Sequence, residues 1–163
     1  MKTIMKPFMI LLFIVTLFSC SSDDDSSNST TNDNFIRAKI NGISYEATGS
    51  GLHGSFDDEG LDIDSRDTNG TGMDFYIIGN VLQGTYNFSS SNVTTQGRLN
   101  YRLTGENFSS GFCSASNGTL TITSINGKTV TGTFSFTGSS MSESCLNPST
   151  KVITEGSFKI TFP

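Results

Sequence analysis

The stretch GTLTITSINGKTVTGTFSFT, residues 118–137, decides the fold class of this 163-residue chain. On both sides of Asn126-Gly127, apolar residues alternate with threonine and serine, which is typical of half-buried β-strands. An Asn-Gly pair between two such runs indicates a tight turn. The stretch therefore predicts two strands joined by that turn.

One residue pattern recurs along the chain: glycine, a small hydroxyl residue, an apolar residue, a polar residue and a second apolar residue. The four segments that carry it are residues 84–88, 118–122, 132–136 and 156–160. In each, the glycine has the same parity as the two apolar residues, and so lies on the same sheet face. Glycine at such a position permits a sharp bend or lets a neighbouring aromatic side chain cross over it. The spacings are irregular, so we expect similar strands rather than a repeat architecture.

The folded part begins with a predicted hairpin. Phe35–Ile40 and Ile43–Thr48 flank Asn41-Gly42, a two-residue signal for a tight turn. Residues 49–59 are rich in glycine and give no clear assignment. Further strands are expected at residues 61–64, 75–78 and 99–103, the second covered on both faces because its run is continuously apolar.

No segment outside residues 1–19 has the apolar spacing of an amphipathic helix, and 17 glycines disfavour helix further. About nine or ten short strands separated by turn signals are typical of an antiparallel sheet protein. We expect an all-β domain at residues 35–163, built as an antiparallel β-sandwich. A closed up-and-down β-barrel is the alternative.

Residues 1–19 are typical of a secretory signal peptide. Lys2 and Lys6 precede a short apolar run, and Cys20 follows a small residue. The run is too short to cross about 30 Å of hydrocarbon. From Ser21 to residue 34 there is no apolar residue, so residues 20–34 are predicted to form a disordered tether. An ordinary signal peptide followed by a chance cysteine is the alternative.

The residues around the predicted cut resemble a bacterial lipobox, since Leu-Phe-Ser precedes Cys20. The resemblance implies a thioether from the Cys20 thiol to diacylglycerol, cleavage before Cys20 and acylation of its new amine by a chain such as palmitate. The following run of serines and aspartates resembles the surface-export signal of Bacteroidota-type lipoproteins, and comprises Ser21, Ser22, Asp23, Asp24 and Asp25. A plain soluble spacer is the alternative for that run.

The charge of the chain limits its partners. Without Lys2 and Lys6, 8 basic residues face 15 acidic ones, which gives 8 − 15 = −7. An acidic chain without a Lys/Arg cluster argues against nucleic acid and against electrostatic docking on anionic lipid. Attachment to a membrane therefore depends on the N-terminal lipid.

Two cysteines remain once Cys20 is assigned to the lipid. Because exported compartments are oxidising, Cys113 and Cys145 are predicted to form a disulfide. Two unpaired thiols are the alternative. A zinc site is not expected, because no Cys-x-x-Cys motif is present.

Catalytic residues are few. The only histidine, His53, lies in a Gly-Leu-His-Gly segment without the nucleophile pattern Gly-x-Ser-x-Gly, so an exposed loop side chain is expected. Glycosidases need only two suitably spaced carboxyls, so a hydrolase stays open as an alternative. The carboxylates that lie close together in the sequence are Asp57, Asp58, Glu59, Asp62 and Asp64.

Oxygen ligands also crowd a glycine turn, at Asp62, Asp64, Asp67 and Asn69. Such residues suit Ca²⁺. The EF-hand pattern is not met, since Arg66 stands at the fifth place and no glutamate at the twelfth. We therefore expect a solvated acidic loop with no bound metal or cofactor, and calcium at these four residues as the alternative.

Taken together, the signal, lipobox, acidic tether, opening Asn-Gly hairpin and closing strands resemble a family of small flavobacterial-type outer-membrane lipoproteins of unknown function. The resemblance implies an all-β domain on an outer-membrane lipid anchor and assigns no catalytic residue. We expect a non-enzymatic domain, displayed at the cell surface, that binds a glycan or an envelope protein. Tyr76 and Tyr101 are candidates for stacking on sugars, although strand packing is the usual role of such tyrosines. A periplasmic small-ligand carrier on a β-barrel is the alternative.

Overall fold

The computed structural model describes residues 33–92 and 95–163, which belong to one compact unit, Thr31–Pro163. The predicted signal peptide, the lipidation site Cys20 and the export signal at residues 21–25 lie outside the described residues. Within the described residues, no helix is long and apolar enough to span a membrane.

The described residues form eleven antiparallel strands and one three-residue 3-10 helix, η1 (Gly49–Gly51), which confirms the all-β prediction. The strands are β1 (Phe35–Ile40), β2 (Ile43–Thr48), β3 (His53–Asp57), β4 (Gly60–Asp64), β5 (Gly72–Ile78), β6 (Gly84–Ser89), β7 (Gly97–Leu103), β8 (Glu106–Ser109), β9 (Asn117–Asn126), β10 (Thr129–Ser140) and β11 (Thr150–Thr161).

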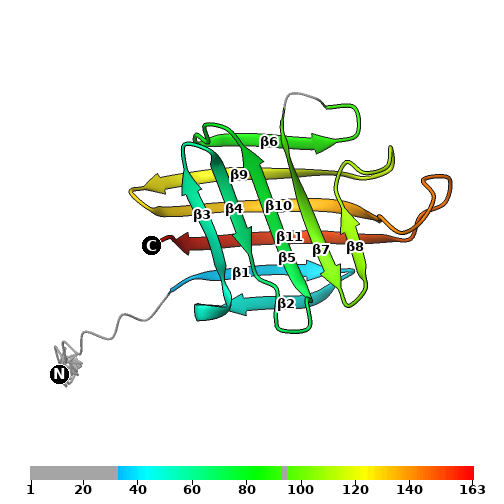
Figure 1. Cartoon of the computed structure of the whole chain (residues 1–163), viewed down its shortest axis with the longest axis horizontal. Coiled ribbons are helices and arrows are strands. Elements are labelled where there is room, and N and C mark those ends of the chain that lie inside the picture. Colours follow the sequence, from blue (N-terminus) through cyan, green and yellow to red (C-terminus); the bar gives the residue numbers. More distant parts are fainter. Residues whose placement is uncertain (1–32, 93–94) are drawn as a thin grey trace, which may run out of the picture. The chain divides into compact units, whose positions relative to one another are not determined.

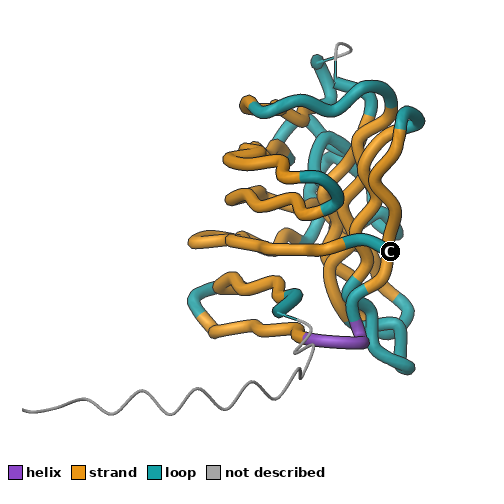
Figure 2. The backbone as a smooth tube through the Cα atoms, turned by 90° about the vertical axis from the view of Figure 1, so that its left-hand side faces the viewer, coloured by secondary structure: helices purple, strands orange, loops and turns teal. Residues whose placement is uncertain are grey.

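The strands are arranged in two layers, whose strands cross each other (Figures 1 and 2). The first layer has the order β2-β1-β11-β10-β9-β6, and the second has the order β8-β7-β5-β4-β3. β10 joins the layers, because residues 129–137 pair with β9 while Ser139 and Ser140 pair with β8. The edge strands are β2, β3 and β6, and β2 and β3 are linked through η1 but do not pair in the described structure. The fold is therefore a curled antiparallel sandwich that is open on one side.

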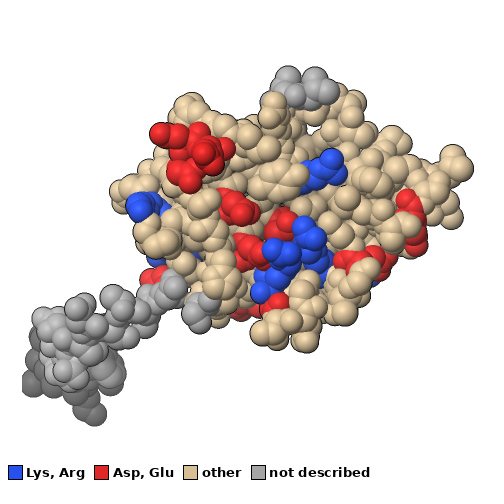
Figure 3. Space-filling view, in the orientation of Figure 1, with Lys and Arg blue, Asp and Glu red and all other residues tan. Residues whose placement is uncertain are grey.

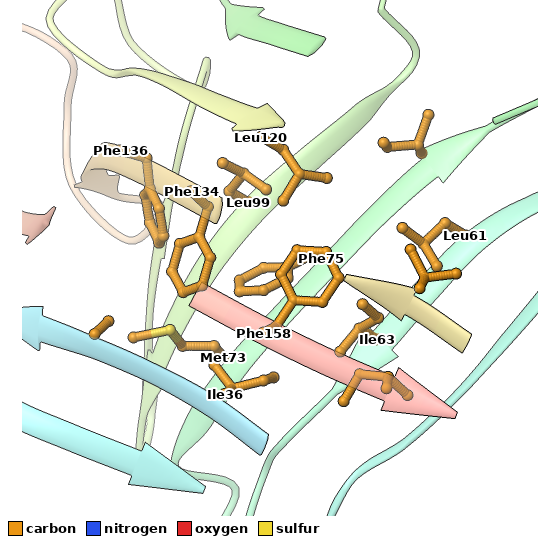
Figure 4. Close-up of a cluster of buried hydrophobic side chains, with 14 of the residues drawn as sticks. Ile36, Leu61, Ile63, Met73, Phe75, Leu99, Leu120, Phe134, Phe136 and Phe158 are labelled. Carbon is orange, nitrogen blue, oxygen red and sulfur yellow. The ribbon is translucent and has the colours of Figure 1, made fainter. Parts of the chain in front are cut away.

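Aromatic side chains from both layers fill the space between them. Phe75 of β5 packs against Phe134 of β10 and Phe158 of β11, with ring centroids 4.6 and 6.3 Å away (Figure 4). Fully burying one such side chain contributes about 1.5–3 kcal/mol, so this cluster is a main source of stability. Aliphatic residues surround the rings, among them Ile36, Leu61, Ile63, Met73, Leu99 and Leu120.

Three of the four recurring glycines lie beside an aromatic residue, as the sequence pattern indicates. Phe158 lies opposite Gly132, and Phe134 lies opposite Gly156, so β10 and β11 exchange the same contact twice. Phe136 lies opposite Gly118 in the same way. The fourth glycine, Gly84, has no atom within 4 Å of the place that a Cβ atom would take.

Several details differ from the sequence-based expectation. β5 is not covered on both faces: Ile78 is 58% exposed and Tyr76 is half-buried, because both face away from the first layer. The turn between β9 and β10 lies one residue later than expected, since Asn126 pairs with Thr129 and leaves Gly127 and Lys128 as the loop.

The folded part begins before residue 35. Asn34 is buried, and its carboxamide accepts from the backbone N–H of Thr161 at 2.8 Å and donates to the Thr161 carbonyl at 3.3 Å. Asp33 lies 3.5 Å from the Nζ of Lys159. Two residues assigned to the tether thus contact the end of β11.

The predicted disulfide between Cys113 and Cys145 is present, with an S–S distance of 2.05 Å and a Cα–Cα distance of 5.4 Å. Cys113 follows β8 and is buried, while Cys145 lies in the exposed loop after β10. The bond therefore ties together two loops at the junction of the layers.

Candidate functional site

The outer face of the second layer, turned away from the first layer, carries a groove of about 340 Å³. Strand register builds it: Asp62 lies opposite Tyr76, and Asp64 lies opposite Asp74. Acidic and basic side chains gather on this face (Figure 3). The groove is lined chiefly by Asp57, Glu59, Asp62, Arg66, Tyr76 and Ile78.

A row of polar residues crosses the same face, one from each of six adjacent strands. Its members are His53, Asp64, Asp74, Asn100, Ser109 and Ser139, each paired in register with the next. From Asp74 to Ser139 the row is buried, with residues between 0 and 8% exposed. Burial of so many polar groups costs free energy unless each is hydrogen-bonded, so their partners matter.

Two arginines neutralise two of the carboxylates. Arg102 donates from Nε and Nη2 to the two oxygens of Asp74, at 2.7 and 3.0 Å. Arg66 likewise donates from Nε and Nη2 to Asp64, with the Nε hydrogen bonds at 2.7 and 2.9 Å. Such two-pronged arginine–carboxylate pairs are strong and geometrically specific.

Asn100 lies opposite Asp74 in the buried part of the polar row. Its Nδ2 donates to Asp74 Oδ2 at 3.1 Å, which fixes the direction of the carboxamide. Asn100 is 3% exposed, and its Oδ1 accepts no hydrogen bond from the described residues. A buried acceptor without a donor is uncommon in folded proteins.

Asp62 differs from its neighbour Asp64. Its carboxylate accepts the backbone N–H of Ile63 but no side-chain hydrogen bond in the part of the chain that the structure describes. Partial burial, together with the charges of Asp64 and Asp74, raises its pKa. Burial alone would also raise the pKa of Asp64, but the hydrogen bonds and charge of Arg66 outweigh it and lower that pKa. Two carboxyls on one strand are thus in opposite electrostatic environments.

Two of the four residues considered for calcium, Asp64 and Asp67, are held by other groups. Asp67 Oδ1 accepts the backbone N–H groups of Asn69 and Thr71, both at 2.9 Å, and Asp64 pairs with Arg66. Among the described residues, no group of three or more His, Cys, Asp or Glu side chains could hold a metal ion.

The remaining candidate residues, His53, Tyr76 and Tyr101, differ in how far they are exposed. His53 is exposed, at the first position of β3 rather than in a loop. Tyr101 is 8% exposed and stacks on Phe108 with centroids 6.4 Å apart, so the idea that it presents a ring to sugars is wrong. Tyr76, by contrast, lies in the groove.

Asp74, Asn100 and Arg102 were not predicted from the sequence. One signal was available for Asp74, because an acidic residue directly before an apolar strand core needs a buried partner. The partner itself could not be named, since Arg102 lies 28 residues away in the sequence.

Comparison with known proteins gives a family and no activity. No curated protein and no solved structure matches the chain. A family model described as "Domain of unknown function (DUF6252)" matches residues 32–160, which is almost the whole described part. The chain therefore belongs to the DUF6252 family, a domain of unknown function.

Proposed function

We propose that the chain is a lipid-anchored, non-enzymatic surface lipoprotein whose β domain binds a glycan in the groove of the second layer. The observation that carries the proposal is the half-buried ring of Tyr76 beside the carboxylate of Asp62, which no side chain among the described residues holds. An aromatic ring offers an apolar face to the C–H groups of a sugar, and a carboxylate is a strong acceptor for its hydroxyl groups.

The packing supports a surface site rather than a carrier interior. A carrier holds its ligand inside the barrel or between the layers. Here the rings of Phe75, Phe134 and Phe158 occupy that space. A hydrolase is supported less, because the two carboxyls whose charges act on Asp62, those of Asp64 and Asp74, are both held by arginines.

The location is proposed from the N-terminal sequence. The signal peptide, the lipobox at Cys20 and the acidic run at Asp23, Asp24 and Asp25 support a diacylglycerol and palmitate anchor in the outer membrane. If flexible, the tether of about a dozen residues has a root-mean-square reach of roughly 20 Å. That reach lifts the domain clear of the lipid headgroups. The domain then faces glycans outside the cell.

A glycan array probed with the full chain in detergent tests the binding. The wild type should bind at least one glycan, Tyr76→Ala should lose most of that binding, and Tyr76→Phe should keep it because the ring remains. Absence of binding to every glycan, or unchanged binding by Tyr76→Ala, would contradict the proposal.

Cell fractionation tests the location. Cys20→Ala should release the chain from the membrane fraction, and protease added to intact cells should remove the domain. Replacement of the three aspartates by alanine should protect it from that protease. Complete resistance of the wild type in intact cells, with digestion only after lysis, would place the domain in the periplasm.

A further inference from the structure

We infer that Asn126 is a site of spontaneous deamidation in the folded domain, and that the structure protects the three other Asn-Gly dipeptides of the chain. The four dipeptides begin at Asn41, Asn69, Asn117 and Asn126. Asn126 belongs to β9 of the first layer, whereas the groove lies on the second layer. A modification at Asn126 is therefore independent of the proposed glycan binding.

Deamidation requires the backbone nitrogen of the glycine to reach the side-chain carbonyl carbon of the asparagine, Cγ. The nitrogen attacks Cγ, the bond from Cγ to the side-chain nitrogen breaks, and ammonia leaves with the proton of the attacking nitrogen. A succinimide ring remains, and water opens it at either carbonyl to give aspartate or isoaspartate. Glycine favours the attack because it has no Cβ to hinder the approach. The rate at each dipeptide then depends on how freely the backbone can rotate.

Asn126 and Gly127 are exposed at the tip of the β9–β10 hairpin. Asn126 is the last residue of β9 and pairs with Thr129 of β10, but β6 pairs with β9 no further than Ile122. Neither the side chain of Asn126 nor the backbone N–H of Gly127 has a hydrogen-bond partner among the described residues. Because the ends of paired segments open most easily, loss of one terminal pair lets Asn126 rotate.

Asn41 is also exposed at a hairpin tip, but its side chain is held. Its Oδ1 accepts the backbone N–H of Val152 at 2.9 Å, and its backbone N–H donates to the Val152 carbonyl at 2.8 Å. Turning Cγ toward the nitrogen of Gly42 would break the first of these hydrogen bonds. Contact with β11 therefore protects this dipeptide.

Asn69 is restrained through its backbone. The N–H of Gly70, which would have to attack, donates to the Asp67 carbonyl at 2.9 Å. The N–H of Asn69 donates to Asp67 Oδ1 at 2.9 Å, and its carbonyl accepts from Thr104 Oγ1 at 3.3 Å. Asn69 is thus exposed, but rotation about its backbone breaks hydrogen bonds that Asn126 does not have.

Asn117 begins a strand that is paired on both sides. It lies in register between Ser89 of β6 and Thr137 of β10, and Gly118 after it is buried between the same two strands. Rotation at Asn117 would disturb both pairings. Each hydrogen bond that must break lowers the rate by up to about tenfold, which corresponds to the net contribution of one such bond.

Deamidation changes the hairpin in two ways. Aspartate places a carboxylate two residues before Lys128, whose carbonyl accepts the N–H of Phe162 at 3.0 Å. Isoaspartate also adds a carbon atom to the main chain, so that residue 126 no longer matches Thr129 in register. The isoaspartate form should therefore have a less stable hairpin.

The test follows the four dipeptides by peptide mapping with mass spectrometry while the full chain is incubated in detergent at mildly alkaline pH. In the folded chain, Asn126 should deamidate about tenfold faster than each of the other three, with both aspartate and isoaspartate as products. In guanidinium chloride, where the native contacts are lost, the four should react at similar rates. Asn126→Gln should remove the early deamidation of the folded chain, and the matched control Asn69→Gln should leave it unchanged.

The same map contains the outcomes that overturn the inference. Deamidation of Asn41, Asn69 or Asn117 in the folded chain as fast as that of Asn126 shows that these contacts do not protect. An Asn126 that stays intact in the folded chain while it reacts in guanidinium chloride shows that the hairpin tip is rigid. An unchanged circular dichroism spectrum during the incubation shows that the reaction occurs in the folded state, and a spectrum that is lost before Asn126 reacts contradicts it.

Discussion

Phe158 lies across Gly132, the residue opposite it on the neighbouring strand. A methyl group on Gly132 would come within 2.6 Å of Phe158 Cε1 and 2.4 Å of the backbone oxygen of Thr121. The ring is buried in the core, and the backbone oxygen belongs to β9, which pairs with β10. The position of this core aromatic therefore depends on the absence of a side chain at Gly132.

Gly132→Ala should lower the free energy of unfolding by about 1–3 kcal/mol, the usual cost of overpacking a core. Denaturant unfolding followed by circular dichroism measures the change. Gly51→Ala is the matched control, because Gly51 is exposed and has nothing within 4 Å of its side-chain position. An equal decrease in the free energy of unfolding in the two variants would show that the contact with Phe158 does not exclude a side chain at residue 132.

Replacement of both Cys113 and Cys145 by alanine should lower the free energy of unfolding by roughly 3.5–4 kcal/mol, the chain-entropy value for a loop of this length. The two residues are separated by 32 positions. Denaturation midpoints with and without reductant measure the loss. The variant should be insensitive to reductant, and the reduced wild type should match it; a wild type unaffected by reduction would contradict the prediction.

Arg102→Met should destabilise the domain by about 2–3 kcal/mol, because it leaves the charge of Asp74 largely buried without its partner. Arg102 itself is a third exposed, so solvent reduces the effect below that of a fully buried pair. Adding Asp74→Asn to this variant should recover part of the loss. A double-mutant cycle measures the coupling, and additive effects would show that the pair contributes nothing.

Much of the fold follows from local sequence signals. The first hairpin has the predicted bounds because the positive φ angles of Asn41 and Gly42 match the tight turn that the pair favours. The two layers could not be predicted, since β10 pairs with β9 over one part and with β8 over another. Alternation shows that a strand has two faces but does not show which layer covers each face, and for this reason the exposure of Ile78 was missed.

The site was predictable only in its parts. The sequence placed Asp62 and Asp64 on one face of a strand, and the structure agrees. It could not show that Arg66 and Arg102 neutralise Asp64 and Asp74 and leave Asp62 without a side-chain partner among the described residues, because the Asp74–Arg102 pair depends on the register of β5 with β7. Cys113 and Cys145 were predictable because few pairings were available.

Asp62 and Asp64 should respond to pH with opposite signs. The lowered pKa of Asp64 means that its contribution to stability is present above the ordinary value of 3.8 and is lost as pH falls through the folded-state pKa. The raised pKa of Asp62 means that its contribution is present below 3.8 and is lost as pH rises through the folded-state pKa. At neutral pH, Asp64→Asn should therefore lower the thermal midpoint, and Asp62→Asn should leave it unchanged or raise it. Both differences should shrink as the buffer is made acidic, and midpoint shifts of the same sign at neutral pH would contradict the proposed environments of the two carboxyls.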